Sequence, residues 1–339
     1  MVMKQSKLQV RKKYTIIGLA IIVAASLTIG GMYIQRNKKT SAQSDTATGV
    51  SPEQADAIFR RYLVKSASSN GYFTNEELSG SGAKLTGTAS FDASKKQILR
   101  EEELHCSAKI DNSEVSLDVS LQVQNATTYY RLNEMDGIVT GADGQTRNFH
   151  DVYANIKGVW YKDPQPDMVA QDQIDNGVFV FNSEVVAPGY DAQQIANFFI
   201  NNRAYTYTQV KKQDGNYVYS FRAIQTNFSE NMLKQLFPGL KAPNDILGQI
   251  FSEKSTLDST LTIAEDGTLV KEESTGKNYC KDVLAIFTGV SQENLPSPNV
   301  LTGSATPVQA KDIQITPITN ARSAEDMAKD LAAPQRQSI

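Results

Sequence analysis

Histidine and cysteine are scarce in this chain, whose 339 residues include two of each. Metal sites in proteins usually bring several His, Cys or carboxylate ligands to one point. His105 and Cys106 are neighbours in an expected strand, so their side chains point to opposite faces and are poorly placed to chelate one ion. We therefore expect no metal site and no bound cofactor.

The sequence also lacks the motifs of common catalytic sites. It contains no Gly-x-Ser-x-Gly nucleophile elbow, and the glycine-rich stretch 80–87 (GSGAKLTG) lacks the Gly-Lys-Ser/Thr ending of a phosphate-binding loop. His150 falls in an expected loop, and the run Glu101 to Glu103 is typical of a solvated strand. A glycosidase-like carboxylate pair stays open, because spacing in sequence does not fix pairing in space. We expect that the protein is not an enzyme.

Acidic residues are absent from positions 1–39, which hold eight Lys or Arg. The other 300 residues carry 26 basic and 37 acidic residues, a net charge of about −11. A domain of this charge repels phosphate backbones, and no basic stripe with interleaved aromatics interrupts it. We expect no nucleic-acid partner.

Residues 14–34 contain no charged side chain over 21 positions. A helix of this length is about 31 Å long and matches the hydrocarbon thickness of a bilayer. The alternative is a cleaved signal peptide, but charged residues follow the apolar run directly. Five basic residues before the run and three after it favour a cytoplasmic N-terminus. The prediction is a single-pass protein of the cell membrane with an extracytoplasmic C-terminal domain.

The rest of the chain predicts an α+β domain. Residues 51–65 carry one apolar stripe at helical spacing behind a Ser51 cap. From residue 84 the period changes to two, most clearly in 114–124, and Asp214-Gly215 and Asp266-Gly267 predict hairpins. We expect a curved antiparallel sheet packed on a few helices. The predicted divisions are a basic cytoplasmic tail (1–13), a transmembrane helix (14–34), a flexible stalk (35–50), the α+β domain (51–290) and a disordered Pro/Ser/Thr-rich tail (291–339).

Cys106 and Cys280 are the two cysteines of the chain. An even count in an exported protein is compatible with one disulfide. Two unpaired buried thiols are the alternative.

Aromatic side chains recur on expected neighbouring strands and alternate so as to share one face. Such a face either lines an apolar ligand cavity or forms the core between sheet and helices. The candidate ligand-binding residues are Tyr205, Tyr207, Tyr217, Tyr219 and Phe221 on strands, with Phe198 and Phe199 on a helix expected at 191–202.

The order of these elements resembles the lipoprotein-carrier-like half-barrels of the LolA and LppX/LprG types. The shared features are an N-terminal anchor, a first amphipathic helix, a strand reading GVWYKD at 158–163, a mid-chain helix and hairpins such as VKKQDGNYVYSF, over about 51–290. The resemblance implies a curved sheet around an apolar cavity that holds acyl chains. This chain lacks an acylated lipobox cysteine, and an anchored carrier could only hand over its cargo locally. Binding of a lipid or another apolar ligand is the first expectation, and a solid-core structural or protein-interaction module of the cell envelope is the alternative.

Overall fold

The computed structural model of the chain describes residues 49–80, 82–110, 113–140, 146–181, 184–202, 205–224, 234–240, 256–277, 280–288, 290 and 300–333. The predicted transmembrane segment 14–34 lies outside these residues, as does most of the predicted stalk.

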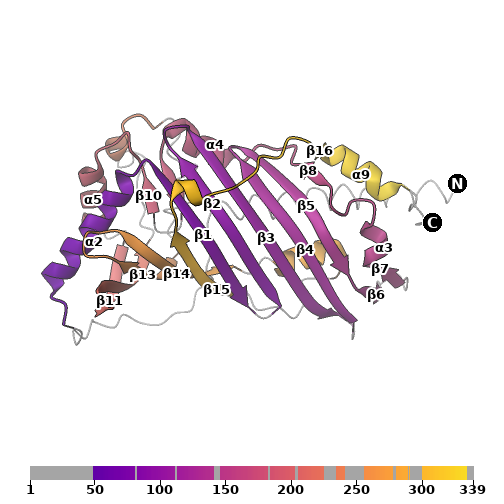
Figure 1. Ribbon diagram of the computed structural model, residues 1–339, viewed down its shortest axis with the longest axis horizontal. Coiled ribbons are helices and arrows are strands. Elements are labelled where there is room, and N and C mark those ends of the chain that lie inside the picture. Colours follow the sequence, from indigo (N-terminus) through magenta and orange to yellow (C-terminus); the bar gives the residue numbers. More distant parts are fainter. Residues whose placement is uncertain are drawn as a thin grey trace.

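One large sheet dominates the structure (Figure 1). In spatial order its strands are β11 (Tyr205–Gln213), β12 (Asn216–Ile224), β13 (Thr256–Ile263), β14 (Leu269–Lys277), β15 (Val300–Pro307), β1 (Gly71–Gly80), β2 (Ala83–Asp92), β3 (Gln97–Ile110), β4 (Ser113–Gln124), β5 (Thr127–Asp136), β8 (Trp160–Lys162) and β16 (Arg322–Ser323). Two small sheets pair β6 (Ile138–Thr140) with β7 (Thr146–Asn148) and β9 (Phe179–Phe181) with β10 (Glu184–Val186). The helices are α2 (Pro52–Ala67), α3 (Phe149–Tyr153), α4 (Met168–Asn176), α5 (Ala192–Asn201), α8 (Cys280–Thr288), α9 (Ala324–Ala332) and the 3-10 helix η2 (Ala310–Asp312).

Helix α2 begins and packs as its sequence predicts. The Ser51 side chain accepts a hydrogen bond from the Gln54 amide, and Pro52 occupies the first turn, where no amide hydrogen is needed. The apolar stripe, with Ile58 and Phe59 at its centre, is buried. The predicted mid-chain helix is likewise confirmed as α5, which packs beside α2.

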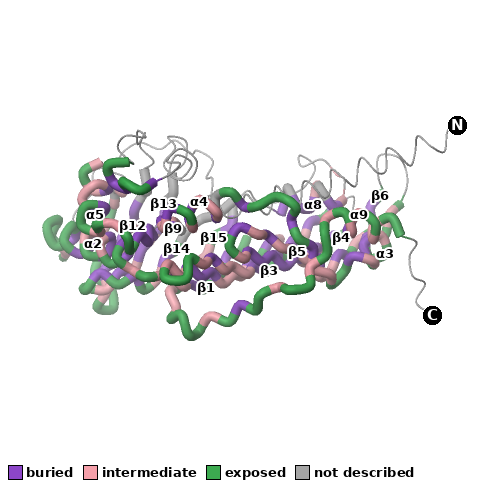
Figure 2. Tube along the Cα trace, turned by 90° about the horizontal axis from the view of Figure 1, so that it is seen from above, coloured by how far each residue is buried: buried purple, intermediate pink, exposed green. Residues whose placement is uncertain are grey.

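The main sheet has two chemically different faces, which the alternation along β3 defines. Leu104 and Cys106 point to the inner face and are buried, whereas Glu103 and His105 point to the outer face and are exposed. Helices α4 and α8 lie on one side of the sheet (Figure 2). Three apolar clusters cover the inner face: α3, α8 and α9 pack on β2 to β5, α2 and α5 pack on β12 and β13, and α4 and β9 pack on the ends of β1 to β4.

A connecting segment, residues 308–321, crosses the outer face between β15 and β16 (Figure 1). The Val308 amide donates to the Phe73 carbonyl oxygen at 2.8 Å at its start. Further along, the Gln122 side-chain amide donates to the Thr316 carbonyl oxygen at 3.1 Å. This crossing buries Gln122, although it belongs to the polar face of β4.

The prediction for the C-terminal part of the chain is corrected by the structure. Within the predicted disordered tail 291–339, the described residues 300–333 instead contribute β15, η2, β16 and α9. Strand β15 pairs with β14 on one side and with β1 on the other, so it joins the two halves of the sheet. Its sequence, VLTGSATP, offers few apolar side chains, and its position depends on main-chain hydrogen bonds to strands far away in sequence.

The predicted fold class and localisation are also corrected. The half-barrel prediction followed from alternating strands, hairpins and the resemblance to lipoprotein carriers, but the structure is a 12-stranded mixed sheet with few helices, in which β8 and β16 run parallel. Among the described residues no helix has the length and apolar character needed to cross a membrane. The single-pass membrane prediction depended on the length of 14–34, its lack of charge and its basic flanks, and it is set aside.

Candidate functional site: an acidic pocket beside the first helix

The seven candidate aromatic residues come together on the inner face of β11 and β12 and on α5. Tyr217, Tyr219, Phe221 and Phe199 are buried, while Phe198, Tyr205 and Tyr207 are half-buried at the edge of the same cluster. Their rings contact one another: the centroids are 5.5 Å apart for Tyr207 and Tyr219, 5.6 Å for Phe199 and Tyr205, and 6.0 Å for Tyr205 and Phe221.

Helix α2 lies against this aromatic cluster. The Phe59 ring centroid is 5.5 Å from that of Tyr219. The Tyr219 hydroxyl donates to the Ala55 carbonyl oxygen at 2.8 Å, and the Tyr217 hydroxyl accepts from the Gln54 side chain at 2.8 Å. The Tyr219 ring and the Tyr217 and Tyr219 hydroxyls therefore contact the helix, as in a close-packed core.

A pocket of about 170 Å³ opens at the other end of α2, next to this cluster. Its walls come from the C-terminal turn of α2, the start of β1, β10, the β13–β14 turn and the residues that follow β15. None of the seven aromatic residues lines it. Side chains in the wall include Tyr62, Ser66, Tyr72, Phe73 and Glu184.

Ser66 fixes β10 to α2 and so builds one wall of the pocket. Its hydroxyl accepts from the Val185 amide at 3.1 Å and donates to the Val185 carbonyl oxygen at 3.0 Å. The Ala187 amide also donates to the Ala67 carbonyl oxygen at 3.0 Å. These bonds place Glu184, the residue before Val185, in the wall.

The turn between β13 and β14 closes the opposite side. A Cβ atom on Gly267 would lie 2.6 Å from the Arg61 carbonyl carbon, so this turn approaches the backbone of α2 as only glycine permits. Lys65 holds the same contact from the helix, because its ammonium lies 2.8 Å from the Asp266 carboxylate.

Glu184 is 6% exposed, which is unusual for a carboxylic acid. Burial raises its pKa from the ordinary 4.5 to about 7, and hydrogen bonding with the side chains of Ser66 and Tyr62 offsets part of this rise. No ion pair reaches Glu184 from any other residue that the structure describes. A carboxyl with a shifted pKa in a pocket wall is a candidate functional group.

A row of buried glutamates runs across the inner face behind this pocket. The register places Glu102 opposite Gly87, Gly87 opposite Glu76, and Ala305 between Glu76 and Glu272. All three glutamates are buried. Arg100 forms ion pairs with Glu76 and Glu102.

Tyr72 connects the row to the pocket. Burial raises its pKa well above the ordinary value, and the charges of Glu272, Glu184 and Glu76 raise it further. These three carboxyl groups therefore lie near one phenol, and Arg100 offsets the charge of Glu76.

Sequence reasoning placed Glu102 in a solvated segment, and this was wrong. Glu102 is 2% exposed. The signal was present, because Glu102 shares the phase of Leu104 and Cys106 along an alternating strand. Glu184 had no comparable signal, since β10 is a short strand whose surroundings come from α2.

Two other polar groupings are weaker candidates. On the outer face, β11 to β14 form a hollow of about 450 Å³ in which Lys271 pairs with Glu273 at 2.8 Å. At the far end of the sheet, the His150 Nδ1 atom lies 3.5 Å from a Glu134 oxygen and 3.3 Å from an Asp136 oxygen. These three could hold a metal ion, but they are largely exposed and Glu134 already contacts Lys157. No motif in the sequence indicated this trio, and His150 lies in α3, not in the predicted loop.

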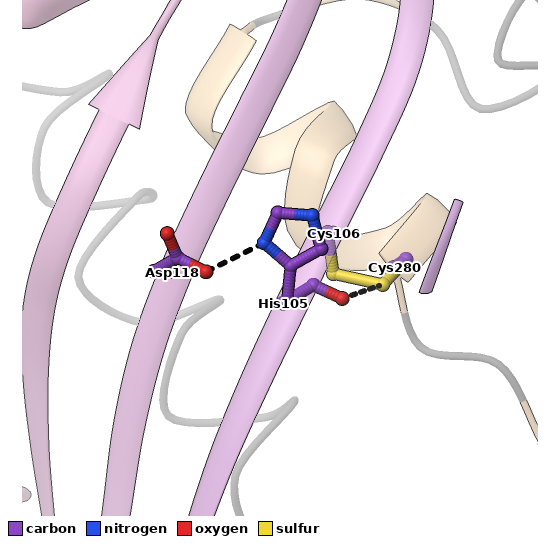
Figure 3. The surroundings of a disulfide bond; sticks show 4 residues. All are labelled: His105, Cys106, Asp118 and Cys280. Atoms are coloured by element: carbon purple, nitrogen blue, oxygen red, sulfur yellow. Dashed lines mark hydrogen bonds and ion pairs between the residues drawn. A yellow bond between two sulfur atoms is a disulfide. The ribbon is translucent and has the colours of Figure 1, made fainter. Parts of the chain in front are cut away.

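Cys106 and Cys280 are joined by a disulfide that ties α8 to the inner face of β3 (Figure 3). Their Cα atoms are 5.3 Å apart. On the opposite face of the same strand, the His105 Nδ1 atom lies 2.6 Å from an Asp118 oxygen. The two neighbours thus point to opposite faces, as strand geometry requires.

Comparison of the chain with protein-family models, with curated proteins and with solved structures gives no match.

Proposed function

We propose that the protein is a non-catalytic module that binds a small ligand in an oxidising compartment, and that its binding site is the pocket beside Glu184. The observation that carries this proposal is a buried carboxyl in the wall of a pocket of about 170 Å³. Concave sites with a few polar groups among aromatic side chains are the usual form of small-ligand sites.

The disulfide supports the choice of compartment. Such bonds persist where the surroundings are oxidising and are rare in a reducing cytosol. Cys106 and Cys280 are the whole cysteine complement of the chain, and both are in the bond.

The packing of the aromatic cluster favours a solid core over an acyl-chain cavity at that face. The rings that the half-barrel hypothesis needed as cavity walls contact one another and α2. Carriage of an acyl chain is therefore not our proposal for these residues, and the resemblance to lipoprotein carriers remains an untested prediction.

The pocket can be tested by filling it. Val308 lines the pocket and is half-buried, so Val308→Trp should block it. Val270 on β14 is exposed and outside the pocket, which makes Val270→Trp the matched control. Ligand-observed NMR with a panel of small organic molecules should show binding to the parent and to Val270→Trp, and none to Val308→Trp. Equal binding to all three proteins would place the ligand elsewhere, and co-purifying acyl lipids would favour the carrier hypothesis.

A further inference from the structure

The chemistry of the pocket wall restricts the charge of its ligand. Glu184 faces the pocket from β10, and burying an ionised carboxylate without a counter-ion is costly. Lys65 also lines the wall, but its ammonium is paired with Asp266 at 2.8 Å. A cationic ligand would supply the missing counter-ion.

The aromatic part of the wall also suits a cation. Tyr62, Tyr72 and Phe73 line the pocket, and the faces of aromatic rings attract organic cations by about 0.5 to 2 kcal/mol per contact. Ca²⁺ or Mg²⁺ would need several oxygen ligands at short range, whereas this wall presents one carboxylate. The volume of about 170 Å³ limits the ligand to a small molecule or to the head group of a larger one.

We infer that the ligand is a small organic monocation, an alkylammonium or quaternary ammonium group, with Glu184 as its counter-ion. This inference rests on the proposed function of the pocket and specifies its ligand class. Glu184 is a binding residue in this role, and Ser66 is a positioning residue that holds β10 against α2.

Choline and 3,3-dimethylbutan-1-ol are suitable probes because they have the same shape and differ in charge. Isothermal titration of the full chain at pH 8 should show choline binding at least about tenfold more tightly than the neutral alcohol. In Glu184→Gln this preference should disappear while the alcohol still binds, since Gln keeps the shape and removes the charge. A thermal melt of Glu184→Gln verifies that the variant folds.

The pH dependence gives a second readout. Choline must displace a proton from Glu184 at low pH, so its affinity should fall from pH 8 to pH 5 while that of the alcohol stays level. The other titratable and charged groups around Glu184 are Tyr62 and Lys65 on α2, Tyr72 and Glu76 on β1, Glu272 on β14 and Tyr205 on β11. Because Glu76 and Glu272 also face this region, the affinity change must vanish in Glu184→Gln to be assigned to Glu184.

The outcomes separate the two proposals. Equal affinity for choline and the alcohol, abolished in both cases by Val308→Trp, would overturn the cation inference and leave the binding function in place. Failure of both probes to bind would overturn both.

Discussion

The Ser66 hydroxyl on α2 is both acceptor and donor for the main chain of Val185, at 3.1 and 3.0 Å. This one side chain joins the first helix to a strand that lies 119 positions later in sequence. It thereby determines where the neighbouring Glu184 carboxyl lies.

Ser66→Ala should lower the free energy of unfolding by about 1 to 3 kcal/mol, because it leaves a buried amide and a buried carbonyl without their partner. Urea unfolding measures the change. Ser68→Ala is the control, since Ser68 is exposed and its hydroxyl makes only a local bond to the Lys65 carbonyl oxygen. A loss no larger than that of the control would show that the Ser66 bonds contribute little.

Glu184 should make the protein less stable as the pH rises. Its pKa is about 7 in the folded state and about 4.5 when exposed, so the folded state binds the extra proton between these pH values. The free energy of unfolding therefore falls as the pH rises through this window, by about 3 kcal/mol in total from this group. Glu184→Gln should match the parent at pH 5 and exceed it at pH 8 in urea unfolding. Parallel pH profiles for the two proteins would exclude this linkage.

Tyr219→Trp tests whether the aromatic cluster is solid. Tyr219 is fully buried among rings, so the larger side chain should overpack and lower stability by about 1 to 3 kcal/mol. Tyr129→Trp, at a half-buried site on the outer face of β5, is the control for the size of the substitution. A stable Tyr219→Trp protein, together with acyl lipid in extracts of the parent, would indicate a cavity there instead.

Reduction of the disulfide should destabilise the fold. The bond closes a loop of 174 residues. By lowering the entropy of the unfolded chain, such a bond stabilises the folded state by about 5 kcal/mol, less any strain. Urea unfolding with and without reductant, and of Cys106→Ala/Cys280→Ala, gives the value. The prediction fails if both thiols react with a maleimide in the unreduced, unfolded protein.

Substituting the glycine in each of two Asp-Gly turns tests how closely the second turn approaches α2. Gly215 and Gly267 both have positive φ, of 79° and 86°. A Cβ atom on Gly215 meets nothing within 4 Å, whereas one on Gly267 would clash with the backbone of Arg61 and Tyr62. Gly215→Ala should cost about 1 to 2 kcal/mol from backbone strain alone, and Gly267→Ala should cost more. Equal thermal shifts would argue against close contact between that turn and α2.

Local signals in the sequence were sufficient to predict several helices and strands. The Ser51 cap and apolar stripe predicted α2, and Asp214-Gly215 predicted the β11–β12 hairpin, because helix caps and tight turns depend on residues a few positions apart. Alternation in 114–124 likewise predicted β4.

The candidate site could not be predicted in the same way. Its wall combines α2, β1, β10 and the β13–β14 turn, and no spacing in the sequence indicates that these meet. The raised pKa of Glu184 comes from its burial beside Tyr62 and Ser66, which only the folded chain brings together. The aromatic residues were correctly expected to share a face, but whether rings close on one another depends on the distance to α2, which the sequence does not contain.

The position of β15 has a consequence for how the chain is made. Strand β1 is synthesised early, yet it pairs with β15, and the Thr74 hydroxyl donates to the Thr306 carbonyl oxygen, 232 positions later. Until the last part of the chain has left the ribosome, β1 keeps one row of main-chain amides and carbonyls exposed, and the two halves of the sheet stay apart. Pairings this distant close slowly, and an open strand edge can recruit other chains. Truncation before residue 300 leaves this edge of β1 open, and we expect it to yield an aggregating product.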